Sequence, residues 1–348
     1  MRSDVKVSNF IGVRAGVSAL MLLVAVATPF VSALAQALGA GPAVLVQVAD
    51  IPMPGAAVRF DYQSLDSAGS RLYISHMNAD QLVVFDTASR TVVANLDGFK
   101  GVHGVLAVPE IDRVFASATG DHRAVFVDSV TLKTVATGGP ITYPDGLAYA
   151  PREGKVFVSD EHGNVDAVLD ATTGKLLANI PLGGGAGNTV YDSVSGHILV
   201  AVHGVNELVA IDPATNGVLG HYPMPGLRNP HGIALDTEDH LAFVAGEENG
   251  RLALVDLNSM RVLSTVPVGE DPDVVAYDSG LKRLYVSAES GHVTVFQVAD
   301  RELKEIGSLT MPFAHTVAVD ARTHLVYFPL QNVGGHPLLR IMRPAELR

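Results

Sequence analysis

Seven polar residues recur along the chain at nearly constant spacing, and their side chains are of types that bind metal ions or transfer protons. Each follows a turn and precedes an apolar run, as in the segments VHG, PDG and PHG. The spacings between successive members are 42, 42, 43, 43, 42 and 42 residues. The members are Asp61, His103, Asp145, Asn188, His231, Asp273 and His315. Imidazole suits zinc or copper, and carboxylates and amides suit calcium or magnesium, so the set predicts a polar binding site.

These residues belong to a longer repeat with the two-residue alternation of half-buried strands. A second strand follows about ten residues later, as in RLYIS from Arg71 and KVFVS from Lys155. A third strand ends in Asp, as in QLVVFD to Asp86, and a fourth closes the unit, as in KLLANIPLG from Lys175. Four short strands per unit of this length are typical of a β-propeller blade. We therefore predict an all-β, seven-bladed β-propeller with four-stranded blades and no substantial helix outside the N-terminal segment.

The two ends of the repeat region predict how the ring closes. The last repeat runs out after three strands near Met342, whereas VLVQVADIPMPG from Val44 resembles an isolated fourth strand. We expect the N-terminal strand to complete the seventh blade, which gives a propeller domain over residues 44–344. In a propeller the first strand of each blade borders the central channel, so the seven recurrent residues should form a ring at the channel mouth.

The N-terminal segment has the pattern of an export signal. Basic residues between Arg2 and Arg14 precede a mostly apolar run at residues 17–27, and small residues at cleavage-site spacing follow it. We predict a signal peptide at residues 1–35, a periplasmic or secreted mature protein, and no membrane span after cleavage. The alternative is an uncleaved anchor, because no charged residue lies between Arg14 and Asp50.

Composition limits the partners. The net charge is -12 at pH 7, which argues against nucleic acid as a partner and favours a cationic or metal-bearing one. The chain has no Cys, which excludes disulfides, thiolate metal sites and a Cys nucleophile. The partners we expect are a small molecule, a metal ion or a periplasmic protein, and we expect a monomer.

The loops between the second and third strands should open on the same face as the ring. This face would hold nine of the 13 histidines. The loop residues that we single out as candidates for ligand contact are His76, Asp160, His162, His203 and Glu247.

The strands RLYVS and KVFVS, in repeats of about 42 residues followed by Asp-, Thr- and Val-containing segments, resemble the YVTN-type β-propeller repeat proteins of bacteria. The resemblance covers residues 44–344 and implies an exported propeller. The segment at Tyr285 departs from the family pattern, because Tyr285-Val286-Ser287-Ala288 lacks the terminal Thr-Asn pair.

A more distant resemblance is to gluconolactonase-like propellers, which bind a divalent metal through acidic and Asn side chains at the channel mouth. It lies in PDG at Asp145 and GNT at Asn188. It implies divalent-metal ligands at Asp145 and Asn188. With the ring residues Asp273 and His231 these form a possible site for calcium, zinc or copper. Those relatives have six blades, and their ring mostly lacks His.

Three functions remain open on the sequence. The ring and loops could form the binding face of a binding or scaffold protein. They could instead form the active site of a divalent-metal-dependent hydrolase of the lactonase type. In the third alternative the ring residues only cap backbone groups and hydrate the channel. The sequence does not decide whether the protein is an enzyme. If substitution of ring residues removes metal and activity together, the protein is a hydrolase. If substitution of loop residues removes partner binding, it is a scaffold.

Overall fold

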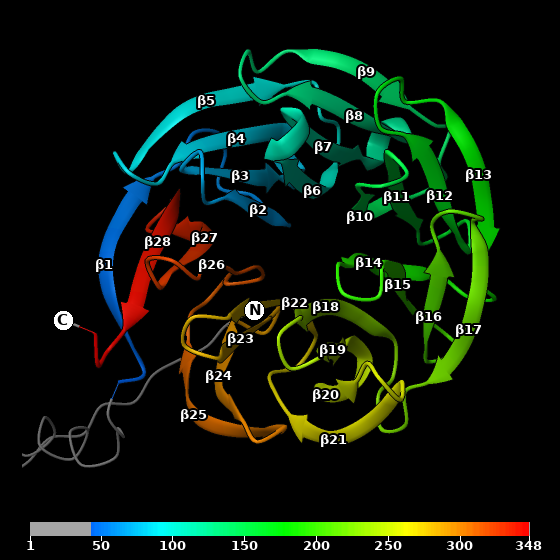
Figure 1. The fold of residues 1–348 in the computed structure, drawn as a ribbon. Helices are drawn as coiled ribbons and strands as arrows, with labels where there is room; N and C mark the ends of the chain where they lie inside the picture. Colours follow the sequence, from blue (N-terminus) through cyan, green and yellow to red (C-terminus); the bar gives the residue numbers. More distant parts are fainter. Residues whose placement is uncertain (1–42, 348) are drawn as a thin grey trace, which may run out of the picture. The chain divides into compact units, whose positions relative to one another are not determined.

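The computed structural model describes residues 43–347, which form seven four-stranded antiparallel sheets arranged as the blades of a propeller (Figure 1). Among these residues there is no α-helix, only four short 3-10 turns. No helix within residues 43–347 is long and apolar enough to cross a membrane. The predicted all-β, seven-bladed fold is confirmed, whereas the predicted signal peptide lies outside the described residues.

Six blades are each built from four consecutive strands, with the innermost strand first (Figure 1). Blades 1 and 2 comprise β2 (Gln63–Asp66), β3 (Arg71–His76), β4 (Gln81–Asp86) and β5 (Thr91–Asp97), then β6 (Val102–Val108), β7 (Arg113–Ala118), β8 (Arg123–Asp128) and β9 (Thr134–Gly138). Blades 3 and 4 comprise β10 (Pro144–Ala150), β11 (Lys155–Asp160), β12 (Val165–Asp170) and β13 (Leu176–Pro181), then β14 (Ala186–Asp192), β15 (His197–Val202), β16 (Glu207–Asp212) and β17 (Gly217–Pro223). Blades 5 and 6 comprise β18 (Pro230–Asp236), β19 (Leu241–Gly246), β20 (Arg251–Asp256) and β21 (Arg261–Pro267), then β22 (Pro272–Asp278), β23 (Arg283–Ala288), β24 (His292–Ala299) and β25 (Glu302–Thr310).

The seventh blade joins the two ends of the described chain. It contains β26 (Ala318–Asp320), β27 (Leu325–Val333) and β28 (His336–Pro344), and β1 (Leu45–Pro52) pairs with β28 as the outer strand. Asp50 stands opposite Arg340 in this pair, and the guanidinium donates two hydrogen bonds to the carboxylate at 2.8 and 2.7 Å. The prediction that the N-terminal strand closes the last blade is confirmed.

The core lies between neighbouring blades. The second and third strands carry consecutive buried residues because both faces pack against another sheet, whereas outer strands such as β13 alternate between partly buried and exposed residues. Phe157 and Val168 of blade 3, for example, share one cluster with Val200 and Val209 of blade 4. Each blade therefore depends on its neighbours to bury its apolar faces.

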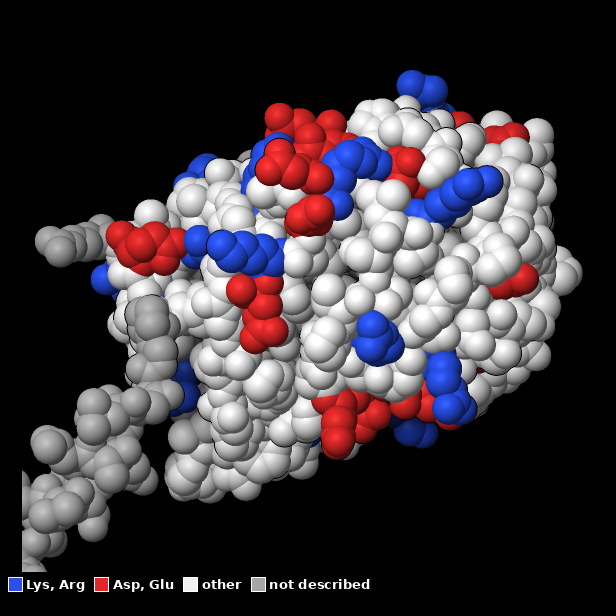
Figure 2. Space-filling view, turned by 90° about the horizontal axis from the view of Figure 1, so that it is seen from below, with Lys and Arg blue, Asp and Glu red and all other residues white. Residues whose placement is uncertain are grey.

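Charge on the outer surface is mixed. On the side seen in Figure 2, acidic and basic side chains are interspersed over a largely uncharged surface. The grouping of polar residues that could do chemistry is instead at one end of the central channel.

Candidate functional site at the channel mouth

The seven recurrent residues stand at or just before the start of the innermost strands, where each chain segment enters the channel wall. A glycine follows three of them, and it has a steric reason. A Cβ atom at Gly104 would overlap the carbonyl oxygen of Asp145, and one at Gly232 would overlap that of Asp273. The two HisGly segments, at Gly104 and Gly232, therefore let their strands pack directly against the ring residue of the next blade.

Six of the seven ring residues form an unbroken series of His–Asp contacts. Each contact joins an imidazole Nε2 atom to a carboxylate oxygen. The series runs from His103 to Asp61 (4.0 Å), Asp61 to His315 (3.5 Å), His315 to Asp273 (2.9 Å), Asp273 to His231 (3.2 Å) and His231 to Asp145 (3.6 Å). Opposite charges can therefore alternate across most of the channel mouth, although only the contacts of Asp273 are as short as hydrogen bonds.

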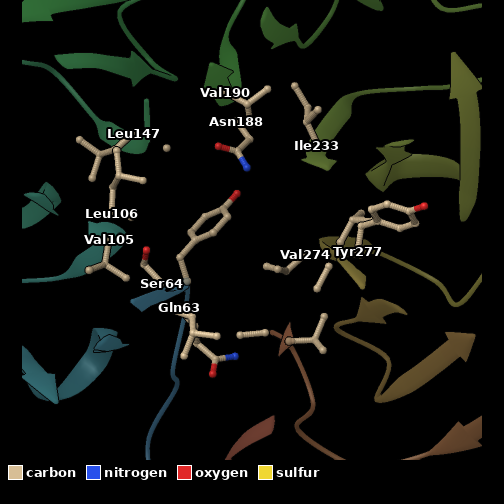
Figure 3. Close-up of a pocket in the computed structure, with 18 of the residues that line it drawn as sticks. Gln63, Ser64, Val105, Leu106, Leu147, Asn188, Val190, Ile233, Val274 and Tyr277 are labelled. Atoms are coloured by element: carbon tan, nitrogen blue, oxygen red, sulfur yellow. The ribbon is translucent and has the colours of Figure 1, made fainter. Parts of the chain in front are cut away.

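Asn188 does not join this series. Its side-chain oxygen accepts a hydrogen bond from the backbone N–H of Thr189 at 2.8 Å, and the side chain borders a second cavity further along the channel (Figure 3). Of the four residues predicted to share a metal ion, the structure brings together Asp145, Asp273 and His231 and places Asn188 elsewhere.

A polar cavity of about 200 Å³ lies at the channel mouth. Its lining includes five carboxylates and a single basic side chain that is always charged. The lining residues are Arg59, Asp61, Tyr62, His103, Tyr143, Asp145, Glu161, His231, Glu247 and Asp273. Within residues 43–347, the buried Oδ1 atom of Asp145 has no hydrogen-bond partner, and those of Asp61 and Asp273 face only the ring nitrogens of His315 and His231, at 3.5 and 3.2 Å. A buried acceptor atom without a partner is costly unless a cation or water binds it.

The buried carboxylates decide the charge of the ring histidines. Burial opposes protonation of His231, but Asp273 and Asp145 outweigh it and raise its pKa to about 9. Burial also opposes protonation of His315, and Asp273 and Asp61 raise its pKa to about 10. Burial raises the pKa of Asp145 well above its usual range, against the effect of His231. Asp273 is therefore a carboxylate paired with the imidazolium groups of His231 and His315, whereas burial favours the protonated form of Asp145.

Arg59 supplies fixed positive charge on one side of the cavity. Its NH2 group lies 2.8 Å from Glu289 Oε1 and 2.9 Å from His315 Nε2. Since the 2.9 Å contact between His315 Nε2 and Asp273 Oδ2 requires a proton on Nε2, the guanidinium donates to Glu289 and only lies beside the imidazole.

On the other side of the cavity the lining residue His231 contacts His203, which does not itself line the cavity. His203 follows strand β15, its backbone N–H donates to Gly185 O at 2.7 Å, and its Nε2 lies 3.1 Å from His231 Nδ1. Glu247 follows β19, where its N–H donates to Asn229 O at 3.0 Å. Donor atoms of His203, His231 and Glu247 all lie within 4.8 Å of one another, and so do those of a second group, Asp61, Asp273 and His315.

The other predicted loop residues do not line the cavity. His76 is fully buried and stacks on Phe60, with ring centroids 4.0 Å apart. Asp160 accepts the backbone N–H groups of Thr142 and Tyr143 at 2.8 and 2.7 Å, which holds Tyr143 in place. His162 is exposed and lies on the Tyr143 ring at 4.1 Å. Asp160 and His162 therefore affect the cavity only indirectly, by positioning Tyr143.

Sequence reasoning missed four residues of the cavity, Arg59, Tyr62, Tyr143 and Glu161. Glu161 could have been found, because it occupies the repeat position directly after the second strand, which His203, Glu247 and Glu289 occupy in the next three blades. Tyr62 and Tyr143 flank ring positions, and their hydroxyl groups lie 3.0 Å from His231 Nε2 and 3.1 Å from His103 Nε2.

A second cavity, of about 280 Å³, continues along the channel and has a largely aliphatic lining (Figure 3). Val105, Leu147, Ile233 and Val274 border it, together with Asn188. Tyr62 is the only described residue that lines both cavities, so its side chain forms part of the wall of each.

Comparison with known proteins identifies relatives in fold only. No protein-family model matches the chain, and no curated protein matches it in sequence, so membership of the YVTN family stays a prediction. A hydrazine synthase of Kuenenia stuttgartiensis has a similar structure, with a TM-score of 0.70, 13% identity, and coverage of 81% of this chain and 95% of the other.

Two lyases are also similar in structure. Virginiamycin B lyase of Staphylococcus aureus has a TM-score of 0.71 at 10% identity, with coverage of 85% and 98% of the two chains. A streptogramin B lyase has a TM-score of 0.71 at 11% identity, with coverage of 85% and 97%. At these identities the similarity establishes that the chain has the fold of a β-propeller protein.

Proposed function

We propose that the protein is an exported binding protein whose channel-mouth cavity takes up a cation, either a divalent metal ion or a small cationic ligand. One observation supports this above all: five carboxyl groups, two histidines and one arginine line a cavity of about 200 Å³, and the buried Oδ1 atom of Asp145 lacks a hydrogen-bond partner among the described residues. A bound cation would satisfy this oxygen and offset the repulsion between the carboxylates.

The setting of this function follows from the sequence. The basic and apolar pattern of residues 1–35 supports export to the periplasm or secretion. The net charge of -12 supports small molecules, metal ions or a periplasmic protein as partners rather than nucleic acid. We propose that the protein acts there as a monomer and belongs to the YVTN-type propellers.

The test is calorimetric titration of the purified full chain with Mg²⁺, Ca²⁺, Zn²⁺, Cu²⁺ and spermidine. The test variant is the double substitution Asp145→Asn and Glu161→Gln, which removes two carboxyl groups of the cavity lining that a bound cation would hold in their charged form. We expect at least one cation to bind, and the variant to bind it about tenfold more weakly or worse, since charge pairs near a protein surface contribute about 1 kcal/mol or more. Asp121→Asn, on an exposed turn, is the control. If no cation binds, or if the double variant binds as tightly as the wild type, the proposal is wrong.

A second candidate function is divalent-metal-dependent hydrolysis. The pairs Tyr62–His231 and Tyr143–His103 favour it, because each places a hydroxyl within hydrogen-bond distance of an imidazole at the edge of the cavity. Two of the structural neighbours are lyases, so elimination substrates belong in the same screen as lactones and esters. If the wild type turns over a substrate and Tyr62→Phe or Tyr143→Phe reduces the rate, the result would support catalysis. If no substrate in the screen is turned over, only the binding function stands.

A further inference from the structure

We propose that His203, His231 and Glu247 are the ligands of a divalent transition-metal ion. The inference builds on the proposed function, since it names the cation and the atoms that hold it. It replaces the ligand set expected from the sequence, in which Asn188 lies in a different cavity.

The first argument is the convergence of two imidazole nitrogens. His203 Nε2 and His231 Nδ1 lie 3.1 Å apart, and both can bind one ion at the usual bond length of about 2.1 Å. The space beside them is kept free by Gly187. A Cβ atom at Gly187 would lie 2.8 Å from His203 Nε2 and 3.0 Å from His231 Nδ1, so a methyl group would occupy the place next to both donor atoms.

The second argument is what faces the opposite nitrogens of the two rings. His231 Nε2 lies 3.2 Å from Asp273 Oδ1, and His203 Nδ1 lies 3.8 Å from Glu161 Oε1. Metal-binding histidines commonly donate their second ring N–H to a carboxylate, which fixes the tautomer and turns the other nitrogen towards the ion. Both rings therefore have a carboxylate on the side away from the proposed ion.

The third argument favours His203, His231 and Glu247 over the other set of possible metal ligands, which is Asp61, Asp273 and His315. There the NH2 group of Arg59 lies 2.9 Å from His315 Nε2 and 3.9 Å from Asp273 Oδ2, so a positive charge is already present. No Lys or Arg of residues 43–347 lies within ion-pair distance of the Glu247 carboxylate, although this side chain borders the cavity. Near Glu247 the positive charge comes from His231, which can release its proton when a metal ion binds, whereas the guanidinium of Arg59 keeps its charge.

The donor set decides the class of metal. Two imidazoles and one carboxylate suit Zn²⁺, Fe²⁺, Co²⁺ or Ni²⁺, whereas Ca²⁺ and Mg²⁺ prefer oxygen ligands alone. Three protein ligands leave further coordination positions open to water or to a ligand in the cavity.

The experiment titrates Zn²⁺ and Co²⁺ into tag-free, full-length protein, with calorimetry for Zn²⁺ and visible absorption for Co²⁺. His203→Ala and Glu247→Gln are the test variants, because His231 is buried in the ring and its replacement could prevent folding. We expect one ion per chain in the wild type, and affinity losses of more than about tenfold for Glu247→Gln and about 100-fold for His203→Ala. Gly187→Ala should also lose binding although it keeps every ligand.

The controls are residues in corresponding places that do not reach the proposed ion. His162→Ala removes an exposed histidine of the neighbouring loop, and Glu289→Gln removes the carboxylate at the repeat position of Glu247 in the next blade. Both should retain Zn²⁺ affinity within about twofold. Circular dichroism spectra and thermal unfolding of every test and control variant check that it is folded.

The outcomes separate the two proposals. A cation that binds with unchanged affinity in His203→Ala, or a preference for Ca²⁺ or Mg²⁺ over Zn²⁺, overturns the ligand set but leaves the cation-binding cavity intact. The absence of any cation binding overturns both.

Discussion

His315 donates a hydrogen bond of 2.9 Å from Nε2 to Oδ2 of Asp273, and both residues are more than nine-tenths buried. The other oxygen of the same carboxylate lies 3.2 Å from His231 Nε2. One aspartate thus compensates two imidazolium groups, because burial alone would disfavour every one of these charges. The pKa of Asp273 is held below its usual range, against the effect of burial, by His315 and His231.

Asp273→Asn should therefore be among the most destabilising single substitutions in the ring. It leaves two buried imidazoles without their shared carboxylate, and loss of one partner from a buried ion pair costs about 3–5 kcal/mol. Urea unfolding of the wild type and the variant at pH 7 measures the difference. Asp121→Asn should change the free energy of unfolding by less than about 0.5 kcal/mol. A comparable stability for Asp273→Asn and the wild type would show that the ring does not depend on this carboxylate.

Gly232→Ala should disrupt the approach of blades 5 and 6. The new methyl group would overlap the backbone carbonyl of Asp273, and backbone atoms cannot move aside as a flexible side chain can. We expect a loss of more than about 2 kcal/mol, within the range for overpacking in a tightly packed interior. Gly217→Ala is the matched control, since the nearest atom to its Cβ is the side-chain oxygen of Thr215 at 3.1 Å. Equal unfolding midpoints for the two variants would contradict this account of the HisGly segments.

Asp166→Asn should stabilise the protein at high pH. Burial raises the pKa of Asp166 to about 8, only partly offset by the hydrogen bond from Thr189, whereas the unfolded chain has the ordinary value near 3.8. A raised carboxyl pKa means that the folded state favours the protonated form, so stability is lost as the pH rises from about 4 to about 8. The variant should gain up to about 5 kcal/mol at pH 8 and little near pH 4.5.

Thermal unfolding of the two proteins between pH 4.5 and pH 8.5 tests this linkage through the difference in their midpoints at each pH. Other titratable groups are the same in both proteins, so their contributions to the pH dependence of stability cancel in that difference. A difference that stays constant across the range would show that Asp166 does not titrate as proposed.

Closure of the ring should depend more on apolar packing between β1 and β28 than on the ion pair between Asp50 and Arg340. Leu339 of β28 is fully buried beside β1, so Leu339→Ala should cost about 2–5 kcal/mol. Asp50→Ala removes the exposed partner of Arg340 and should cost about 1 kcal/mol or less. Urea unfolding of the two variants gives the comparison, and a larger loss for Asp50→Ala would reverse this ranking.

The repeat spacing made the fold predictable, because a propeller is defined by local strand patterns that recur blade by blade. Closure by residues near Val44 followed from counting strands in the last repeat. The ring positions followed as well, because the start of each inner strand has one place in such a blade.

The contacts within the ring were not predictable in the same way. They depend on side-chain rotamers, which the spacing does not determine. Asn188 is short enough to bind its own following N–H, and His76 turns into the core onto Phe60. Arg59 enters from the segment that links the closing strand to blade 1, which has no counterpart in the repeat.

Tyr62 forms part of the wall of both the polar cavity and the cavity with mostly aliphatic side chains. A change in the orientation of this one side chain would therefore alter the shape of both cavities at once, so the occupancy of one cavity would affect the other.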